Sequence, residues 1–212
     1  MKKAVIFLNG DKSDVSRVKN NIDDKTFIIG CDGGTKYAVD LGLIPHVVLG
    51  DMDSLSPGLK KELMKKNVKF VSYSTKKDNT DAELALFYAI KQGCKEIILT
   101  GILGTRIDHM LATIHMLANP KFKNIKLRII EGNQDMYIIK SKIKLTGKKG
   151  DTISLIPLNG NVTGITTKNL AYALQGQALR GYDTLGVNNM MLKSTAEITL
   201  KKGTLLVVHE HK

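Results

Sequence analysis

The feature that most constrains the fold is a regular alternation of strand-like and helix-like segments over the first two-thirds of the chain. The strand-like segments are short apolar runs bounded by Gly, Asp or Asn, namely KAVIFLN, TFIIGCD, HVVLGD, VKFVSY, KEIILTG and IKLRIIEG. Between them, the helix-like stretch DAELALFYAIKQG repeats its apolar residues near a helical period and ends at Gly93. This alternation predicts a Rossmann-like α/β domain, with a mostly parallel sheet and helices on both faces.

The pattern changes near residue 140, beyond which we expect no helix. Short alternating segments such as DTISLIPL follow, separated by turn signals at Asn159-Gly160, Gly176 and Gly203. A series of short strands with regular turns is typical of an antiparallel β-sandwich. We therefore expect an α/β domain at residues 1–141 and a C-terminal β-sandwich at residues 142–212.

The formal net charge of +12 taken alone favours a nucleic-acid partner. However, the lysines are scattered in pairs such as Lys2-Lys3 and Lys148-Lys149, and aromatic residues make up only 5% of the chain. The chain thus offers no stacking platform for bases. A solvated lysine surface or a polyanionic small substrate explains the charge better, so we expect no nucleic-acid partner and keep a basic binding module as the alternative.

The apolar runs and the cysteines bear on the compartment. The longest runs, such as AVIFL, are far too short to span a bilayer, so we expect no membrane partner. The first apolar run stops at Asn9 without a cleavage site, which favours a strand over a signal peptide. Cys31 and Cys94 form no CxxC pair and are typical of reduced residues in a cytoplasmic protein.

Several familiar catalytic motifs are missing from the sequence. It contains no G-x-x-x-x-G-K-[ST] phosphate loop, no G-x-G-x-x-G after a strand, no G-x-S-x-G elbow and no H-E-x-x-H pair. His109 and His115 lie on one expected helix at a spacing that does not suit metal ligation, so we interpret them as structural. We interpret the terminal HEH, residues 209–211, as a polar tail.

Aspartates follow four consecutive strands of the expected sheet, at the point where each strand ends. They are Asp32 after TFIIGC, Asp51 and Asp53 after HVVLG, Asp78 and Asp81 after VKFVSY, and Asp108 after KEIILTG. Because the carboxyl ends of parallel strands meet at one edge of a sheet, we expect these carboxylates to lie together. Clustered carboxylates repel one another unless a cation neutralises them, and carboxylate oxygens suit Mg²⁺. The sequence therefore predicts a magnesium site at this edge.

Glycines and an arginine at the same edge complete a phosphate-binding pattern. The glycines whose N–H groups could approach phosphate oxygens are Gly33, Gly34, Gly101 and Gly104. Arg106 would supply a fixed planar cation. Each piece alone has a structural explanation, since Asp32 with its two glycines can be a turn, and Thr80 with Glu83 can be a helix capping box. The combination favours a phosphoryl-type transfer site.

The order of these motifs, CDGG…GDMDSL…DNTDAELAL…GILGTRIDH, resembles that of the thiamine pyrophosphokinase (thiamin diphosphokinase) family. The later NLAYAL…GYDTLGVNN and GTLLVV are similar to the C-terminal part of that family, so the resemblance covers nearly the whole chain. It implies a nucleotide-binding catalytic α/β domain followed by a β-sandwich for thiamine binding and dimerisation. It also implies a homodimer with active sites at the subunit interface, and transfer of pyrophosphate from ATP to the hydroxyl of thiamine with release of AMP.

The resemblance also implies roles for individual residues. Asp51, Asp53 and Asp81 would bind Mg²⁺, with Asp32 and Asp108 completing the acidic cluster. The residues near the nucleotide phosphates or the substrate would be Asp32, Gly33, Gly34, Lys77, Thr80, Gly104 and Arg106. Asn188 and Asn189 of the partner subunit would close over thiamine, although this chain reads Gly-Val-Asn-Asn at residues 186–189 where the family often has Gly-x-Ser-Asn.

Two points stay open at this level. Asp53, Asp81 or Asp108 could accept the proton of the attacking hydroxyl. The same pyrophosphate transfer could also act on another alcohol, such as a pterin or a sugar.

Overall fold

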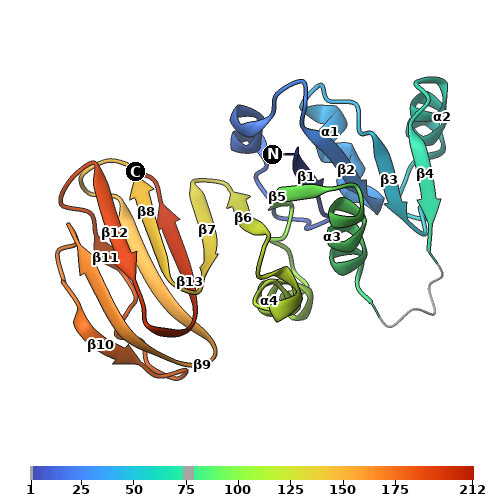
Figure 1. The fold of residues 1–212 in the computed structure, drawn as a ribbon. Coiled ribbons are helices and arrows are strands. Elements are labelled where there is room, and N and C mark those ends of the chain that lie inside the picture. Colours follow the sequence, from blue (N-terminus) through green and yellow to red (C-terminus); the bar gives the residue numbers. More distant parts are fainter. Residues whose placement is uncertain (1, 74–78) are drawn as a thin grey trace. The chain divides into compact units, whose positions relative to one another are not determined.

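The computed structural model describes residues 2–73 and 79–212, and the chain divides into two compact units (Figure 1). The first, called here the α/β unit, comprises Met1–Met116 and Lys121–Gly132. The second, called the β unit, comprises Leu117–Pro120 and Asn133–Lys212. The packing boundary thus lies between Gly132 and Asn133, whereas the sequence pattern placed a domain boundary after residue 141.

The α/β unit is built on a parallel sheet with the strand order β4-β3-β2-β1-β5-β6. Its strands are β1 (Lys2–Phe7), β2 (Phe27–Cys31), β3 (Val47–Gly50), β4 (Lys69–Ser72), β5 (Cys94–Thr100) and β6 (Lys126–Glu131). Every neighbouring pair in this order runs parallel. The carboxyl ends of β1, β2, β3 and β5 therefore meet at one edge, where a ligand site is expected in such sheets.

Helices connect these strands, and local capping explains where two of them begin. The helices are α1 (Thr35–Asp40), α2 (Pro57–Lys65), α3 (Asp81–Lys91) and α4 (Ile107–Leu117), with short 3-10 turns η1 (Ser16–Asn21), η2 (Asp32–Gly34) and η3 (Pro120–Phe122). The Ser56 hydroxyl accepts a hydrogen bond from Leu59 N at the start of α2. Thr80 does the same for Glu83 N at the start of α3, so half of the expected capping box forms.

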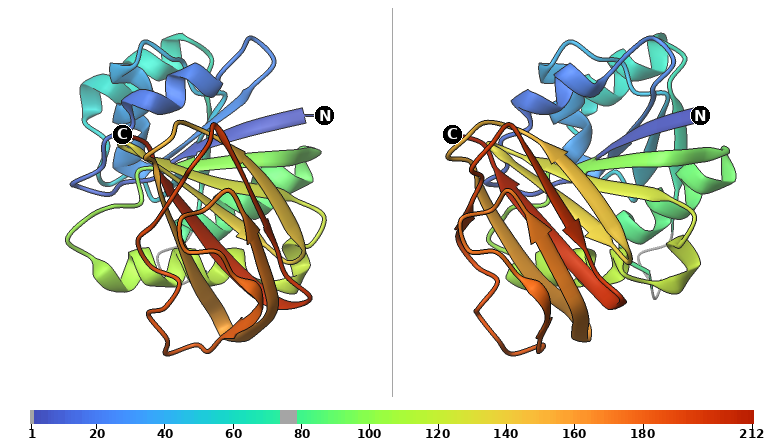
Figure 2. Two further views of the ribbon diagram at one scale, coloured as in Figure 1. Left: turned by 90° about the vertical axis from the view of Figure 1, so that its left-hand side faces the viewer. Right: turned by 60° about the vertical axis from the view of Figure 1, so that its left-hand side comes forward.

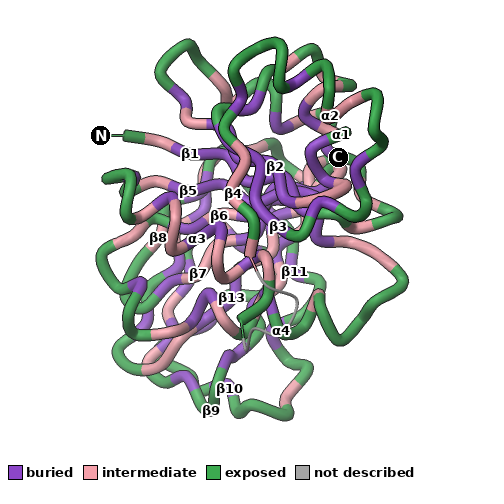
Figure 3. Tube along the Cα trace, turned by 90° about the vertical axis from the view of Figure 1, so that its right-hand side faces the viewer, coloured by how far each residue is buried: buried purple, intermediate pink, exposed green. Residues whose placement is uncertain are grey.

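The core of the α/β unit follows from strand alternation. Val5 and Phe7 of β1 are fully buried in a cluster with Ala38 of α1. Ala4 and Ile6 alternate with them and are equally buried, so both faces of β1 are covered. Helix α3 contacts β1, β2, β3 and β5. In Figure 3 the central strands are correspondingly coloured as buried along almost their whole length.

The β unit contains antiparallel strands throughout. They are β7 (Gln134–Ile139), β8 (Lys142–Thr146), β9 (Thr152–Lys168), β10 (Gln175–Leu179), β11 (Asn189–Met190), β12 (Thr195–Thr199) and β13 (Lys202–Glu210). The order is β7-β13-β9-β12-β8, and β10 and β11 also pair with β9. The long strand β9 pairs with β13 over its first part and with β12 at its end. Figure 2 shows the strands of the β unit from two further sides, coloured from yellow to red. The prediction of a chain that mixes helices with strands is confirmed.

The interpretation of residues 209–211 as a polar tail is wrong. Residues up to Glu210 belong to β13, which pairs with β7 on one side and β9 on the other. Alternate side chains of a strand point to opposite faces of the sheet, and His209 lies on the same buried face as Leu205 and Val207, where it contacts Asp151. Among the residues that the structure describes, no helix is long and apolar enough to cross a membrane.

Candidate active site

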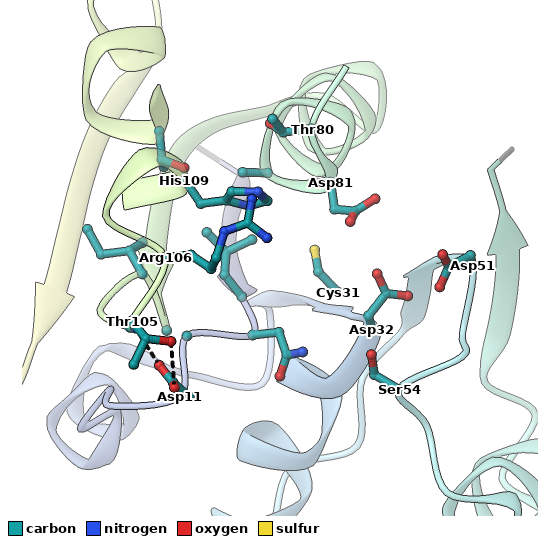
Figure 4. Close-up of a pocket in the computed structure, with 18 of the residues that line it drawn as sticks. Asp11, Cys31, Asp32, Asp51, Ser54, Thr80, Asp81, Thr105, Arg106 and His109 are labelled. Atoms are coloured by element: carbon teal, nitrogen blue, oxygen red, sulfur yellow. Dashed lines mark hydrogen bonds between the residues drawn. The ribbon is translucent and has the colours of Figure 1, made fainter. Parts of the chain in front are cut away.

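A cavity of about 650 Å³ in the α/β unit lies at the carboxyl ends of β1, β2, β3 and β5 (Figure 4). Its lining includes the loops that follow these strands and the first residues of α3 and α4. The lining residues with polar side chains are Asn9, Asp11, Asp32, Asp51, Asp53, Ser54, Thr80, Asp81, Thr105, Arg106, His109 and Thr113. The strand-end argument therefore predicts most of the charged residues that this cavity contains.

Three carboxylates are directed into one part of the cavity. Figure 4 shows Asp32 after β2, Asp51 after β3 and Asp81 at the start of α3 facing a common space. Burial raises the pKa of Asp32 to about 6, and the carboxylates of Asp81 and Asp51 add to this against an opposing hydrogen bond from Met52 N. Carboxylates that disfavour one another's charge in this way fit a divalent cation, which would neutralise them.

Unusual backbone conformations keep the acidic cluster in place. Asp32 and Met52 both have positive φ, 44° and 65°, and Oδ1 of Asp32 accepts the Met52 N–H at 3.0 Å. Gly50, with φ of 133°, ends β3 directly beside them. A Cβ atom at Gly50 would lie 1.8 Å from Oδ1 of Asp32, so only glycine leaves room for that carboxylate. Strain of this kind is often found at functional sites.

Asp51 and Asp53 are joined by a local turn in the loop after β3. The Asp53 N–H donates to Oδ1 of Asp51 at 3.2 Å, which brings the two side chains to the same part of the loop. The Ser54 hydroxyl donates to Asp53 at 2.9 Å and holds the pKa of that carboxyl below its usual range. Asp53 therefore stays ionised at the exposed rim of the cavity.

The loop after β5 carries Arg106 to the cavity. Hydrogen bonds join this loop to the loop after β1. Asp11 accepts hydrogen bonds from Thr105 N at 2.7 Å and from the Thr105 hydroxyl at 3.0 Å. Arg106 donates to both carboxylate oxygens of Asp108, at 3.0 and 2.8 Å, and this pairing lowers the pKa of Asp108 to about 2. Among the described residues that line the cavity, Arg106 is present and Asp108 is not.

The four glycines that we expected to approach phosphate oxygens have two different roles. Gly101 and Gly104 line the cavity. Gly33 and Gly34 are not among the described lining residues and instead form η2 behind Asp32. A Cβ atom on Gly34 would lie 2.5 Å from the Leu8 carbonyl, so this glycine allows the turn to pack closely on β1.

The remaining predicted site residues are Thr80, Lys77, Asn188 and Asn189. Thr80 lines the cavity and caps α3, while Lys77 falls in the stretch that the structure does not describe. Asn188 and Asn189 belong to the β unit. The buried Asn189 side chain accepts from Tyr172 N at 3.0 Å and donates to Tyr172 O at 2.7 Å, so it holds the loop that precedes β10.

Sequence reasoning missed two parts of the cavity. The loop Asn9–Asp11 follows β1, so the rule that selected the aspartates after the later strands would also have selected it. His109, which we interpreted from the sequence as structural, lines the cavity. No local signal marked His109, because its position depends on the packing of α4.

Glu131 at the end of β6 is a further missed residue. Its Oε1 accepts the N–H of Ile102 at 2.6 Å, and Ile102 lines the cavity. Burial raises the pKa of Glu131 to about 7. This buried carboxyl thus supports the loop that carries Arg106, although it is not itself part of the cavity lining.

Comparison with known proteins shows what this architecture is similar to. Residues 18–129, more than half of the chain, match the family model "Thiamin pyrophosphokinase, catalytic domain". The chain belongs to the thiamin pyrophosphokinase family. Residues 138–205 match a second model, "Thiamin pyrophosphokinase, vitamin B1 binding domain". Both models confirm the resemblance in the motif order and the expectation of a thiamine diphosphokinase.

Individual relatives agree with the family models. The chain is 29% identical over 210 residues to the thiamine pyrophosphokinase of Bacillus subtilis, covering 98% of both chains. The crystal structure of thiamine pyrophosphokinase from Bacillus subtilis superposes with a TM-score of 0.89 at 27% identity over 100% of both chains. A Candida albicans thiamin pyrophosphokinase structure, at 16% identity and a TM-score of 0.82 over 99% of this chain and 89% of that chain, shares the fold.

Proposed function

We propose that this thiamin pyrophosphokinase family member transfers pyrophosphate from ATP to the hydroxyl of thiamine in a Mg²⁺-dependent reaction. The observation that carries the proposal is the acidic cluster in the cavity. Asp32, Asp51 and Asp81 come from three different elements and face one space, where burial together with the charges of Asp81 and Asp51 raises the pKa of Asp32. A cluster of this kind opposite Arg106 provides what a polyphosphate with a bound cation requires.

Mg²⁺ would be held by Asp51, Asp53 and Asp81, with Asp32 beside them. When bound, it would neutralise the phosphate oxygens and the carboxylates together. Arg106 would bind phosphate oxygens as a planar donor, and its pairing with Asp108 already fixes the guanidinium in one orientation. The N–H groups near Gly101 and Gly104 would approach the phosphates closely because these residues lack a side chain.

The reaction forms one bond and breaks another at the β-phosphorus. The thiamine hydroxyl oxygen attacks this phosphorus, the bond to the bridging oxygen of the α-phosphate breaks, and AMP leaves with the electron pair. The hydroxyl proton passes to a carboxylate, and catalysis depends mainly on in-line placement. Of the three candidate bases, Asp108 is the least suited because Arg106 lowers its pKa to about 2. Asp53 and Asp81 both line the cavity.

We propose that the two parts of the chain divide this work. Residues 1–141 would form a Rossmann-like nucleotide-binding catalytic domain, supported by the parallel strand order and the strand-end cavity. Residues 142–212 would form a β-sandwich that binds thiamine, supported by the way β9 serves two sets of antiparallel strands. The loop with Asn188 and Asn189 would close over thiamine.

We also propose a homodimer with active sites at the subunit interface. The β unit exposes large apolar side chains around the expected thiamine loop, as a subunit interface would require. They are Tyr172, Tyr182, Leu185, Val187 and Leu192. Sedimentation analysis should give twice the mass of the chain.

The free cysteines Cys31 and Cys94 support a cytoplasmic location.

The decisive experiment is an assay of AMP release with Mg-ATP and thiamine. Thiamine-dependent AMP together with thiamine diphosphate is the expected result, and ADP alone would overturn the proposal. A panel containing pterin and sugar alcohols tests the alternative substrates by the same readout. Salt-sensitive nucleic-acid binding that survives Asp51→Asn, without AMP release, would instead favour the basic binding module.

A further inference from the structure

Two histidines and two aspartates gather in the β unit, and the proposed reaction uses none of them. Asp135 lies on β7, Asp151 directly precedes β9, His209 lies on β13, and His211 follows it. The strand register places His209 opposite Asp135. Asp135, Asp151 and His209 are buried, whereas the His211 side chain is 29% exposed.

The polar atoms of this cluster lie close together. Nε2 of His209 is 2.9 Å from Oδ2 of Asp151, and Nε2 of His211 is 2.7 Å from Oδ2 of Asp135. Nδ1 of His211 lies 3.7 Å from the same Oδ2 of Asp151. The two imidazole rings are 4.0 Å apart between centroids. Ligand atoms of His209, His211 and Asp151 all lie within 4.8 Å of one another.

The contact between His211 and Asp151 depends on which nitrogen of the His211 ring carries its proton. Nε2 of His211 lies 2.7 Å from Oδ2 of Asp135, and in the neutral tautomer in which Nε2 donates to Asp135, Nδ1 carries a lone pair. That lone pair faces an oxygen of Asp151, which is also an electron-pair donor. A cation between Nδ1 of His211 and this oxygen of Asp151 would accept an electron pair from each atom, so the repulsion between them would be replaced by two favourable contacts. The carboxylate that orients a ring through its second nitrogen is a frequent companion of metal-binding histidines.

Backbone N–H groups orient the Asp151 carboxylate, and Gly147 leaves space beside it. Lys148 N donates to Oδ2 of Asp151 at 2.9 Å, and Lys212 N donates to Oδ1 at 3.2 Å, so the carboxylate is held from two sides. A Cβ atom on Gly147 would lie 2.4 Å from Oδ2 of Asp151 and 2.8 Å from Nε2 of His209. Glycine at this position therefore keeps open the space in which a small ion would meet both ligands.

We propose that His209, His211 and Asp151 bind a borderline transition-metal ion of the Zn²⁺ type, through Nε2, Nδ1 and Oδ2 respectively, with the ion replacing the proton between Nε2 of His209 and Oδ2 of Asp151 and the ring of His209 then carrying its proton on Nδ1. Two imidazole nitrogens and one carboxylate oxygen suit Zn²⁺ rather than Mg²⁺, which prefers oxygen ligands alone. The exposure of His211 leaves access for the ion and for a water as fourth ligand. Bound metal would tie β13 and the segment that follows it to the loop before β9, so metal binding would be coupled to the stability of the β unit.

The test uses the full chain without a histidine tag, with Mg²⁺ in excess to occupy the acidic cluster. Co²⁺ serves as the probe because four-coordinate Co²⁺ absorbs visible light, and Zn²⁺ should displace it. We expect one Co²⁺ per chain and a higher thermal unfolding temperature with Zn²⁺. His211→Gln should weaken Co²⁺ binding more than tenfold, and Asp135→Asn, which removes no ligand, should weaken it about tenfold.

Two further variants separate a metal site from a merely structural network. His115→Gln removes an exposed histidine of the α/β unit and should leave Co²⁺ binding unchanged. Gly147→Ala keeps all three ligands but fills the space, and should abolish binding while circular dichroism shows a folded chain. Absence of Co²⁺ bands in the wild type, or bands that persist in His211→Gln and Gly147→Ala, would overturn the proposal.

Discussion

The acidic cluster of the α/β unit and the histidine–aspartate cluster of the β unit are assembled in opposite ways. The first consists of residues that follow strand ends, on loops with positive φ angles at Asp32 and Met52. The second consists of side chains brought together by strand register, from positions as distant as Asp135 and His211. In the first cluster like charges face one another, and in the second each carboxylate has an imidazole partner.

This difference explains why one cluster could be predicted from the sequence and the other could not. Parallel strands end at a common edge whatever their exact register, so a list of residues after each strand already predicts a site. Antiparallel strands place a residue beside its partner only when the register is known. Substitutions in and around the two clusters test whether they differ in this way.

Asp51→Asn should reduce turnover about a hundredfold or more, because it removes one of the carboxylates that would hold Mg²⁺. Thiamine-dependent AMP release measures this effect. Asp40→Asn is the matched control, since Asp40 is an exposed aspartate of the same unit that forms an ion pair with Lys36, and this variant should retain full activity. Equal loss in both variants would mean that the acidic cluster has no special role.

Glu131→Gln should remove a pH dependence of stability. Burial raises the pKa of Glu131 from 4.5 to about 7, so between these values the folded chain holds a proton that the unfolded chain has released. The stability of the wild type should therefore fall as the pH rises from about 4.5 to about 7, by about 3 kcal/mol at most. The neutral glutamine should lack this fall.

Urea denaturation of both proteins across this pH range provides the measurement for Glu131. The free energy of unfolding of Glu131→Gln relative to wild type should increase with pH and level off above about 7. A difference that stays constant with pH would show that Glu131 carries no buried proton.

Neutralising one carboxylate in each cluster should shift metal-free stability in opposite directions. Asp32→Asn should stabilise by about 1 kcal/mol, because it relieves repulsion with Asp51 and Asp81 while an amide oxygen can still accept from Met52 N. Asp151→Asn should destabilise by about 1 to 3 kcal/mol, because His209 and the backbone donors lose a buried carboxylate partner.

Chemical denaturation of the two Asp-to-Asn variants and of the wild type, in the presence of a chelator, measures both changes in stability. Shifts of the same sign would contradict the distinction between a repulsive cluster and a paired one. Far-UV circular dichroism of both variants should match the wild type.

Asp108→Asn should have the smallest effect on turnover, a loss of roughly two- to tenfold, because it only releases the fixed orientation of Arg106. Arg106→Lys should cost more, since a lysine cannot reproduce the planar two-point contact. Steady-state kinetics with thiamine and ATP compares the two variants. If Asp108→Asn proved as damaging as Asp51→Asn, Asp108 would act on the substrate directly.

The mixture of parallel and antiparallel elements, the acidic edge and the family could all be predicted from local sequence patterns. Alternating apolar runs report strands and helices locally, and Asp51 and Asp81 stand at strand or helix ends that short-range patterns reveal. The packing boundary after Gly132 was harder to locate, because both sides of it are strand-like and only long-range contacts distinguish them.

The use of the remaining side chains depends on the packing of the folded chain. It directed Asp108 to Arg106 and away from the described cavity lining, placed His109 in that lining, and buried His209 beside Asp151. The physical reason is that side-chain direction depends on helix packing and strand register, which join residues far apart in the chain and leave no trace in local composition.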